Sequence, residues 1–244
     1  MKSYNLTYKQ YGERAILIEW PSRIEENILK DIINYKNKIV NYNIKLLVEV
    51  INTYNSLTII YVTTIENIDS EISSLKSIYK KPVIIKHENN YCWDVPVCYD
   101  QQFGLDLQEI SDVNGIPIDE IISLHTGSTY TVFFIGFLPG FLYLGGLSKH
   151  LHFKRRSTPR LMVQQGSVGI GGTQTGVYSM QSAGGWNIIG KSPISFFDLS
   201  KESPCFAKAG DKIKFVPVNI NEYKKIEVEV AIDFYKLKNQ VLND

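Results

Sequence analysis

Three features are scarce or missing in this sequence of 244 residues. It holds only three cysteines, Cys92, Cys98 and Cys205, without C-x-x-C spacing, so neither a disulfide framework nor a zinc site is expected. No stretch approaches the roughly 18 to 20 consecutive apolar residues that a membrane-spanning helix needs. The first residues lack the basic start and apolar centre of a signal peptide. These absences predict a soluble cytoplasmic protein with reduced thiols.

Neither sign of charge is in excess. The chain has 26 Lys and Arg against 25 Asp and Glu, a formal net charge of +1. Such a balance gives no whole-molecule field that would attract nucleic acid or an anionic membrane. Hydrophobic residues make up 44% and charged residues 21% of the chain, which is ordinary for globular proteins, so a packed core is expected.

The first 90 residues alternate strand and helix patterns. Apolar residues at helical spacing predict one helix within 22–40, with Ser22 as its N-cap, and another within 66–79. Strand-like runs come before the first helix, fill 44–62 around a turn, and return at 82–87. The order β-α-β-β-α-β predicts a small ferredoxin-like α+β sandwich over residues 1–90.

The remaining residues, 91–244, have a different texture. Two short helical patterns, at 106–115 and 116–125, imitate a helix-turn-helix. Neither is basic, so DNA binding is not expected. From Tyr130 onward, short apolar runs punctuated by glycine and proline predict a small β-barrel or sandwich. The tail at 222–244 is ambiguous between strand and helix.

Residues 185–192, GWNIIGKS, match the phosphate-binding P-loop pattern G-x-x-x-x-G-K-S. A true P-loop needs a flexible loop of small residues between a strand and a helix. Here the four middle residues include Trp186, Ile188 and Ile189, which are typical of a strand. We therefore predict that the match is accidental.

Three glycine-rich motifs follow one another along the chain. They are HTGSTYTVFFIGFLPGFLYLGGL at 125–147, TPRLMVQQGSVGIGGTQTGVY at 158–178 and GGWNIIGKSP at 184–193. With these motifs the chain, over essentially its whole length, resembles the family called allophanate hydrolase subunit 1 or KipI-like, which includes the B subunits of 5-oxoprolinases. The resemblance implies a cyclophilin-like β-barrel over residues 91–244, after the small first domain.

The resemblance implies three alternative functions. The first is a subunit of an ATP-dependent 5-oxoprolinase complex that hydrolyses 5-oxo-L-proline to L-glutamate with subunits A and C, the latter being similar to allophanate hydrolase subunit 2. The second is inhibition of a histidine kinase, and the third is the carboxyltransferase half of an allophanate- or urea-degrading system. A chain of this length without a biotin-carrying region favours the first, and we expect it to be inactive alone. ATP is the implied cofactor, bound here or on a partner subunit, and no metal-ligand set is visible.

Opening a lactam requires groups that hold the substrate's carboxylate, polarise its amide and stabilise negative charge. Arg160 is a candidate clamp for the carboxylate, because a guanidinium binds such a group with two parallel hydrogen bonds; the alternative is a surface salt bridge. His125 is a candidate acid or base near neutral pH. Its alternative is a structural role at the C-terminus of a helix.

The glycine-rich motifs supply the other candidates. Backbone N–H groups of residues 169–172 either line an anion-binding nest or form a tight turn. Gln174 and Tyr178 are candidate hydrogen-bond donors or ordinary surface and core residues, and Trp186 is a candidate apolar wall or a core residue. The predicted substrate-binding set is Pro139, Gly140, Gly169, Gly171, Gly172, Gln174, Tyr178 and Trp186.

One basic stretch interrupts the otherwise balanced charge. Residues 150–160, HLHFKRRSTPR, hold five Lys, Arg and His among their first seven positions. The stretch is a solvated loop, a docking surface for the partner subunit, or an entry funnel for an acidic substrate.

Overall fold

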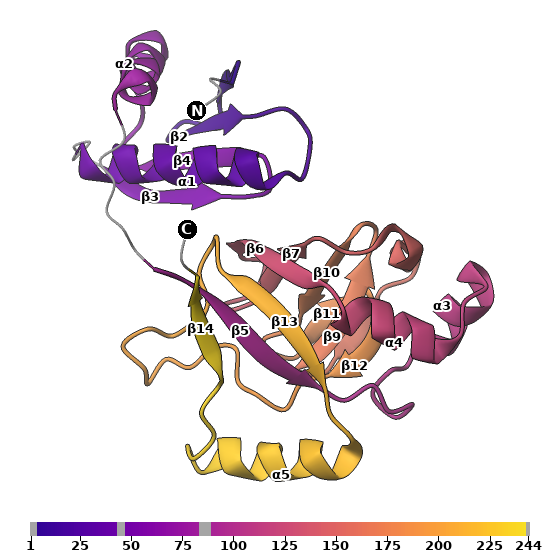
Figure 1. The fold of residues 1–244 in the computed structure, drawn as a ribbon. Coiled ribbons are helices and arrows are strands. Elements are labelled where there is room, and N and C mark those ends of the chain that lie inside the picture. The colour runs from indigo at the N-terminus through magenta and orange to yellow at the C-terminus, as the bar shows by residue number, and fades with distance from the viewer. Residues whose placement is uncertain (1–3, 43–46, 83–88, 243–244) are drawn as a thin grey trace. The chain divides into compact units, whose positions relative to one another are not determined.

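The computed structural model describes residues 4–42, 47–82 and 89–242 (Figure 1). The chain forms two compact units, Met1–Glu88 and Asn89–Asp244. Both units mix helices with β-sheet, and each has its own hydrophobic core. The mixed class predicted from the sequence is therefore confirmed.

The first unit is built on a four-stranded antiparallel sheet in the order β1-β2-β4-β3. Isoleucines from the sheet and from both helices alternate or recur at helical spacing, so they meet in one core. The bounds are β1 Thr7–Gln10, β2 Ala15–Glu19, α1 Glu26–Asn41, β3 Leu47–Asn52, β4 Ser56–Tyr61 and α2 Ile68–Lys80.

The prediction that Ser22 is the N-cap of the first helix is wrong. The N-cap of α1 is Glu25, three residues later, and its side chain makes no capping hydrogen bond. The reason is local: the Arg23 N–H donates to the Pro21 carbonyl at 2.7 Å, so the chain turns before the helix starts. Residues 83–87 of the strand predicted at 82–87 lie outside the described residues. The ferredoxin-like order of strands and helices therefore stays a prediction.

The second unit is built on an eight-stranded sheet in the order β12-β9-β10-β7-β6-β13-β5-β14. Strands β13 and β5 are parallel, and the other neighbours are antiparallel. Strands β8 and β11 pair with each other in a separate small sheet. The strands are β5 Asn90–Val97, β6 Thr129–Ile135, β7 Leu142–Gly145, β8 Arg160–Val163, β9 Ser167–Gly171, β10 Gln174–Val177, β11 Ser182–Gly184, β12 Asn187–Lys191, β13 Lys212–Pro217 and β14 Asn239–Leu242.

No closed barrel is found in the described part of the second unit. The sheet has two edge strands, β12 and β14. One bridge joins the end of β5 to the end of β12, where Cys98 and Lys191 exchange backbone hydrogen bonds of 2.9 Å. The sheet therefore curves until its strand ends meet at one point, but the cyclophilin-like arrangement is not confirmed.

The second unit shows the secondary structure of three segments discussed in the sequence analysis: the two short helical patterns, the tail and the P-loop spelling. The two short helical patterns are α3, Leu107–Asn114, and α4, Ile118–Thr126, separated by Gly115. The ambiguous tail contains both a helix, α5 at Ile220–Ala231, and strand β14. The P-loop spelling falls on β12, and no helix follows it at 192–199, which confirms that the match is accidental.

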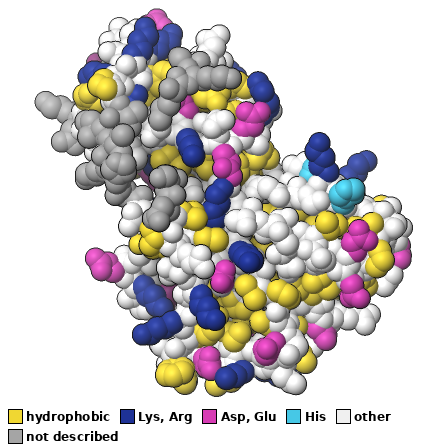
Figure 2. Space-filling view, viewed as in Figure 1, with side chains coloured by type: hydrophobic (Ala, Val, Ile, Leu, Met, Phe, Trp, Pro, Cys, Tyr) yellow, Lys and Arg dark blue, Asp and Glu magenta, His cyan; other side chains and the backbone are white. Residues whose placement is uncertain are grey.

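The surface carries charges of both signs. Figure 2 shows Lys and Arg side chains interspersed with Asp and Glu over the visible face of each unit, in keeping with the net charge of +1. In the described ranges, every helix is too short or too polar to cross a membrane.

Candidate functional site

An aromatic pocket of about 250 Å³ lies in the second unit. Phe141, Tyr178 and Trp186 form its base and belong to a small apolar cluster apart from the main core. The Phe141 ring meets those of Tyr178 and Trp186 edge-on, with centroids 5.2 and 5.5 Å away. Such T-shaped contacts between aromatic rings stabilise the base of the pocket. The lining residues are Phe137, Phe141, Tyr143, Arg155, Arg156, Pro159, Tyr178, Gly184, Gly185 and Trp186.

Trp186 lies against glycines of the sheet. A Cβ atom at Gly171 would stand 2.7 Å from atoms of the indole, so only glycine leaves room for the ring. Gly169 and Gly171 belong to β9, which pairs with strands on both sides. The Gly172 N–H donates to the Phe153 carbonyl at 2.7 Å. These contacts do not support an anion-binding nest, and the tight-turn alternative describes Gly172, whose φ is +68°.

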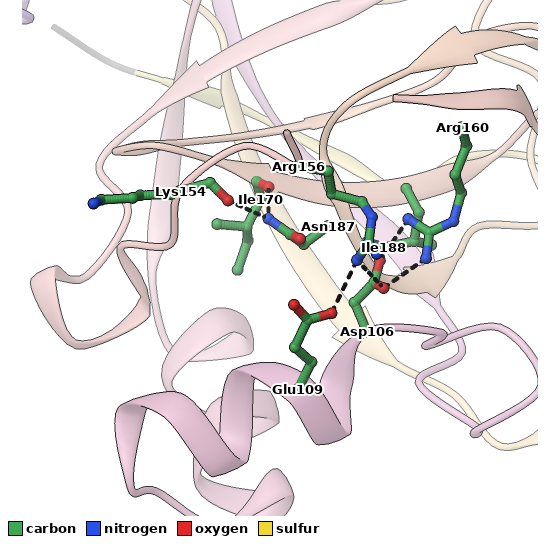
Figure 3. A network of polar contacts seen from close by, with 8 residues as sticks. All are labelled: Asp106, Glu109, Lys154, Arg156, Arg160, Ile170, Asn187 and Ile188. Carbon is green, nitrogen blue, oxygen red and sulfur yellow. Dashed lines mark hydrogen bonds and ion pairs between the residues drawn. The ribbon is translucent and has the colours of Figure 1, made fainter. Parts of the chain in front are cut away.

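A buried carboxylate beside the pocket organises two arginines (Figure 3). Asp106, with only 3% of its side chain exposed, accepts two hydrogen bonds from Arg160, at 2.9 and 2.6 Å. It also accepts one from Arg156 at 3.0 Å and one from the Ile188 N–H at 2.6 Å. The carboxylate therefore ties the basic stretch to both α3 and β12.

Asp106 was not among the residues predicted from the sequence. It precedes α3, where an aspartate ordinarily caps the helix, yet its side chain makes no capping hydrogen bond and turns to the arginines instead. Its partners lie 50 and 54 residues further along the chain. An acidic residue at the start of a helix gives no signal for such distant partners.

Arg160 is not available as a clamp for a ligand. Both terminal nitrogens of its guanidinium are engaged by Asp106, and it does not line the pocket. Its side chain is 26% exposed, so the salt-bridge alternative describes it, although the bridge is partly buried rather than at the surface.

Arg155 and Arg156 both line the pocket but differ in their partners. Arg156 contacts Asp106 and also Glu109, at 2.9 Å. The Arg155 guanidinium lies over the Trp186 ring, 5.5 Å from its centroid. Within the described residues Arg155 has no ion pair and no hydrogen bond from its side chain. It therefore brings an uncompensated positive charge to the mouth of the pocket.

The basic stretch at 150–160 is anchored rather than freely solvated. Phe153 and Gly172 exchange backbone hydrogen bonds of 3.1 and 2.7 Å, and the Arg156 N–H donates to the Gly185 carbonyl at 2.8 Å. The Asn187 side chain donates to the Lys154 carbonyl at 2.8 Å (Figure 3). These bonds fix the backbone that carries Arg155.

His125 lies in the main core, away from the pocket lining. Its side chain is fully buried and stacks on Phe215, with centroids 4.6 Å apart. The Thr175 hydroxyl donates to the Gly169 carbonyl at 3.0 Å, so Nε2 of His125 donates to Thr175 and Nδ1 accepts from the Tyr99 hydroxyl at 2.7 Å.

Burial lowers the pKa of His125 from 6.5 to about 3, because the charged imidazolium is poorly solvated there. The ring is therefore neutral near pH 7, and its two nitrogens are occupied. The ring does not line the pocket, so the geometry does not support a role as acid or base. His125 lies in the last turn of α4 and has a structural role there, through its contacts in the core rather than by capping the helix end.

The other predicted residues divide between the pocket and its support. Tyr178 and Trp186 line the pocket, whereas Gln174, at the start of β10, does not. Pro139 and Gly140 lie in the turn that follows Phe137, and a Cβ atom at Gly140 would meet the Phe196 carbonyl at 2.7 Å. They shape this turn without lining the pocket.

Phe137 itself was not predicted. It is 65% exposed and has a φ of +68°, one of two residues other than glycine with a positive φ in the described ranges. This backbone conformation is strained for an aromatic residue. A strained, exposed aromatic ring at the mouth is a feature of binding sites rather than of cores.

The pocket suits a small ligand with a flat apolar body and one negative charge. Its volume is below the roughly 300–1,000 Å³ of pockets that hold drug-sized molecules, which favours a small ligand. The titratable side chains among its described lining residues are tyrosines and arginines. Burial raises the pKa of Tyr143 and of Tyr178, which keeps both phenols protonated as hydrogen-bond donors. Across the described ranges, no group of three or more acidic, His or Cys side chains is placed to hold a metal ion.

Comparison with known proteins gives consistent matches. The family described as "Carboxyltransferase domain, subdomain C and D" matches residues 6–207. The chain is 33% identical to the 5-oxoprolinase B subunit of Bacillus subtilis (strain 168), over 91% of this chain and 96% of that protein. It is 34% identical to the 5-oxoprolinase B subunit of Escherichia coli O157:H7, over 84% of this chain and 93% of that protein. The structure of the K. lactis urea amidolyase resembles it with a TM-score of 0.84 at 20% identity, over 98% of this chain and 16% of that chain, a likeness of fold alone.

Proposed function

The chain belongs to the carboxyltransferase-domain family of subdomains C and D, together with proteins named as B subunits of 5-oxoprolinase, and we propose that it is the B subunit of a 5-oxoprolinase complex. In this complex it acts with subunits A and C to hydrolyse 5-oxo-L-proline to L-glutamate with consumption of ATP. The observation that carries the proposal is identity of 33% or more to three such subunits.

The chemistry of the pocket supports this substrate. 5-Oxo-L-proline is a small, nearly flat lactam ring with one carboxylate. Edge-on aromatic rings offer a surface for the ring, and Arg155 offers a charge for the carboxylate. The protonated Tyr178 phenol, which lines the pocket, is a candidate donor for the lactam oxygen.

The same lining explains why the chain should be inactive alone. No carboxylate, histidine, cysteine, serine or lysine is among the described residues that line the pocket. A general base or nucleophile for hydrolysis must therefore come from another subunit. We also propose that ATP binds on a partner subunit, because the P-loop spelling of this chain forms strand β12 rather than a phosphate-binding loop.

Reconstitution tests the proposal. The chain is purified with subunits A and C, and glutamate and ADP are measured with 5-oxo-L-proline as substrate. We expect both products from the trio, and none when this chain is omitted or supplied alone. Absence of turnover from a correctly assembled trio would contradict the function.

A second candidate is carboxyl transfer in allophanate or urea degradation. It is favoured by the description of the matching family. The same assembly, given carboxybiotin and urea, would then transfer the carboxyl group to a urea nitrogen, giving allophanate and free biotin, whereas a 5-oxoprolinase would form no allophanate.

A further inference from the structure

Two adjacent arginines of the pocket have opposite electrostatic surroundings. Arg156 and Arg160 bring two positive charges to Asp106 and Glu109, which bring two negative charges. This group is internally neutral. Arg155 stands outside it and supplies the net charge of the pocket.

The position of Arg155 leaves its donors usable. A guanidinium over an aromatic face is attracted by the ring, while its five N–H donors remain available to another partner. Arg155 lies over Trp186 in this way and is exposed to solvent. Its nearness also opposes the rise in the pKa of Tyr143 and of Tyr178 that burial causes, so its field reaches the interior of the pocket.

We propose that Arg155 is the substrate-binding residue that recognises the carboxylate of a small, flat, singly charged ligand held on the aromatic base. The identity of that ligand as 5-oxo-L-proline rests on the proposed function; its chemical class does not. Arg160, the candidate from the sequence, is excluded from this role because Asp106 occupies its fork. Arg156 is disfavoured for a different reason: its charge is already balanced by two carboxylates, which both accept from its Nη1.

The chain offers a matched control for the test. Lys154 is exposed, carries the same charge, and stands next to Arg155 in sequence, but does not line the pocket. Figure 3 shows the Lys154 side chain directed away from the Asp106 network. Lys154→Gln therefore removes one positive charge from the same loop without touching the proposed contact.

The first arm measures kinetics in the reconstituted complex. Arg155→Gln should raise the KM for 5-oxo-L-proline about 10- to 100-fold, the effect of losing hydrogen bonds to a charged group. Arg155→Lys should recover part of the loss, since it restores the charge without the planar fork. Lys154→Gln should change the KM less than about twofold, because an exposed charge outside the pocket is screened. Equal effects of Arg155→Gln and Lys154→Gln would overturn the inference while leaving the proposed function intact.

The second arm measures binding to the full chain without turnover. The Trp186 indole N–H signal, assigned with Trp186→Phe, is followed by NMR during titration with 5-oxo-L-proline or with 2-pyrrolidinone, the same ring without the carboxylate. The acid should bind the wild type at least about tenfold more tightly, and Arg155→Gln should abolish this preference. If the trio shows no turnover but this preference exists and depends on Arg155, the proposed function fails and the inference stands. If the wild type binds both ligands equally, or neither, the inference is overturned.

Discussion

The two units each contain an aromatic cluster with a charged side chain, and the clusters differ in whether that charge has partners. In the first unit, Trp20 and Tyr79 both donate to one oxygen of Asp31, at 2.8 and 2.7 Å. Between their rings lies Tyr35, whose hydroxyl donates to the Leu75 carbonyl at 2.7 Å. The three donors and one oxygen of the Asp31 carboxylate are therefore satisfied within the chain.

In the second unit the aromatic cluster meets Arg155, whose guanidinium lies over Trp186 but has no ion pair or hydrogen bond among the described residues. A polar group with all its partners inside the chain stabilises the fold. A charged group that faces a pocket without partners is available to a ligand. The comparison therefore predicts that substitutions around saturated groups change stability, whereas substitutions at the open pocket change binding.

The largest effect on stability is expected at Asp106. Asp106→Leu leaves two guanidinium groups and the Ile188 N–H without their shared acceptor. Removing one side of a buried ion pair typically lowers the free energy of unfolding by about 3–5 kcal/mol. Urea denaturation of the full chain measures the loss.

Glu109→Gln is the matched control for that substitution. Glu109 pairs with the same Arg156, but its side chain is 52% exposed. An exposed ion pair contributes less than about 1 kcal/mol. Equal losses for the two variants would show that Asp106 does not organise the site.

The next largest effect is on acid stability, through His125. Its folded pKa of about 3 is below its ordinary value of 6.5, so the unfolded chain binds the proton more readily. The stability that the neutral ring contributes is complete above pH 6.5 and is lost as the pH falls toward 3. Between pH 6.5 and 5 the loss from this group is about 2 kcal/mol.

The measurement compares the free energy of unfolding of the wild type and of His125→Asn as a function of pH. The curve of the variant should be flatter between pH 6.5 and 5. Should the variant fail to fold, NMR titration of the wild-type ring gives the answer directly. A ring that becomes protonated near pH 6.5 in the folded protein would contradict the prediction.

A smaller loss is expected at Asp31 in the first unit. Asp31→Ala leaves the Trp20 and Tyr79 donors without their acceptor. Stranded donors typically lower the free energy of unfolding by about 1–3 kcal/mol. The KM of the reconstituted complex should stay unchanged, because Asp31 does not line the pocket. A raised KM would contradict the distinction between the Asp31 cluster, whose polar groups have partners within the chain, and the pocket cluster, whose Arg155 is available to a ligand.

The sequence was sufficient where the signal is local. The isoleucines at helical spacing predicted α2, whose N-cap Asn67 accepts from the Ser70 N–H at 2.9 Å. The bulky residues between the glycines of GWNIIGKS identified strand β12. In both cases neighbouring residues decide the structure, so one stretch of sequence is enough.

The sequence was insufficient where the partner is distant. Choosing between Arg155 and Arg160 as the anion-binding residue depends on Asp106, which lies about 50 residues earlier and pairs only after α3, β8 and β12 have come together. The burial of His125 likewise depends on Tyr99 and Thr175, from other segments. The residue types of Arg160 and His125 suggested anion binding and acid–base chemistry. They did not reveal the tertiary partners that decide whether each side chain is available.

The smallest effect on stability is expected at Phe137, where the open pocket and backbone strain coincide. Phe137→Gly relieves the positive φ but also frees the unfolded chain and removes the edge contact with Phe141. The free energy of unfolding should therefore change by only about 1 kcal/mol or less. The KM of the complex should rise, because the exposed ring lines the mouth.

Asp233→Gly is the control for that substitution, since Asp233 has a φ of +54° and does not line the pocket. Aspartate tolerates this conformation better than phenylalanine does, so the change in stability should be smaller still and the KM should stay the same. If Phe137→Gly also leaves the KM unchanged, the strained ring serves the turn and not the ligand, and the open part of the site contracts to Arg155 and the three rings beneath it.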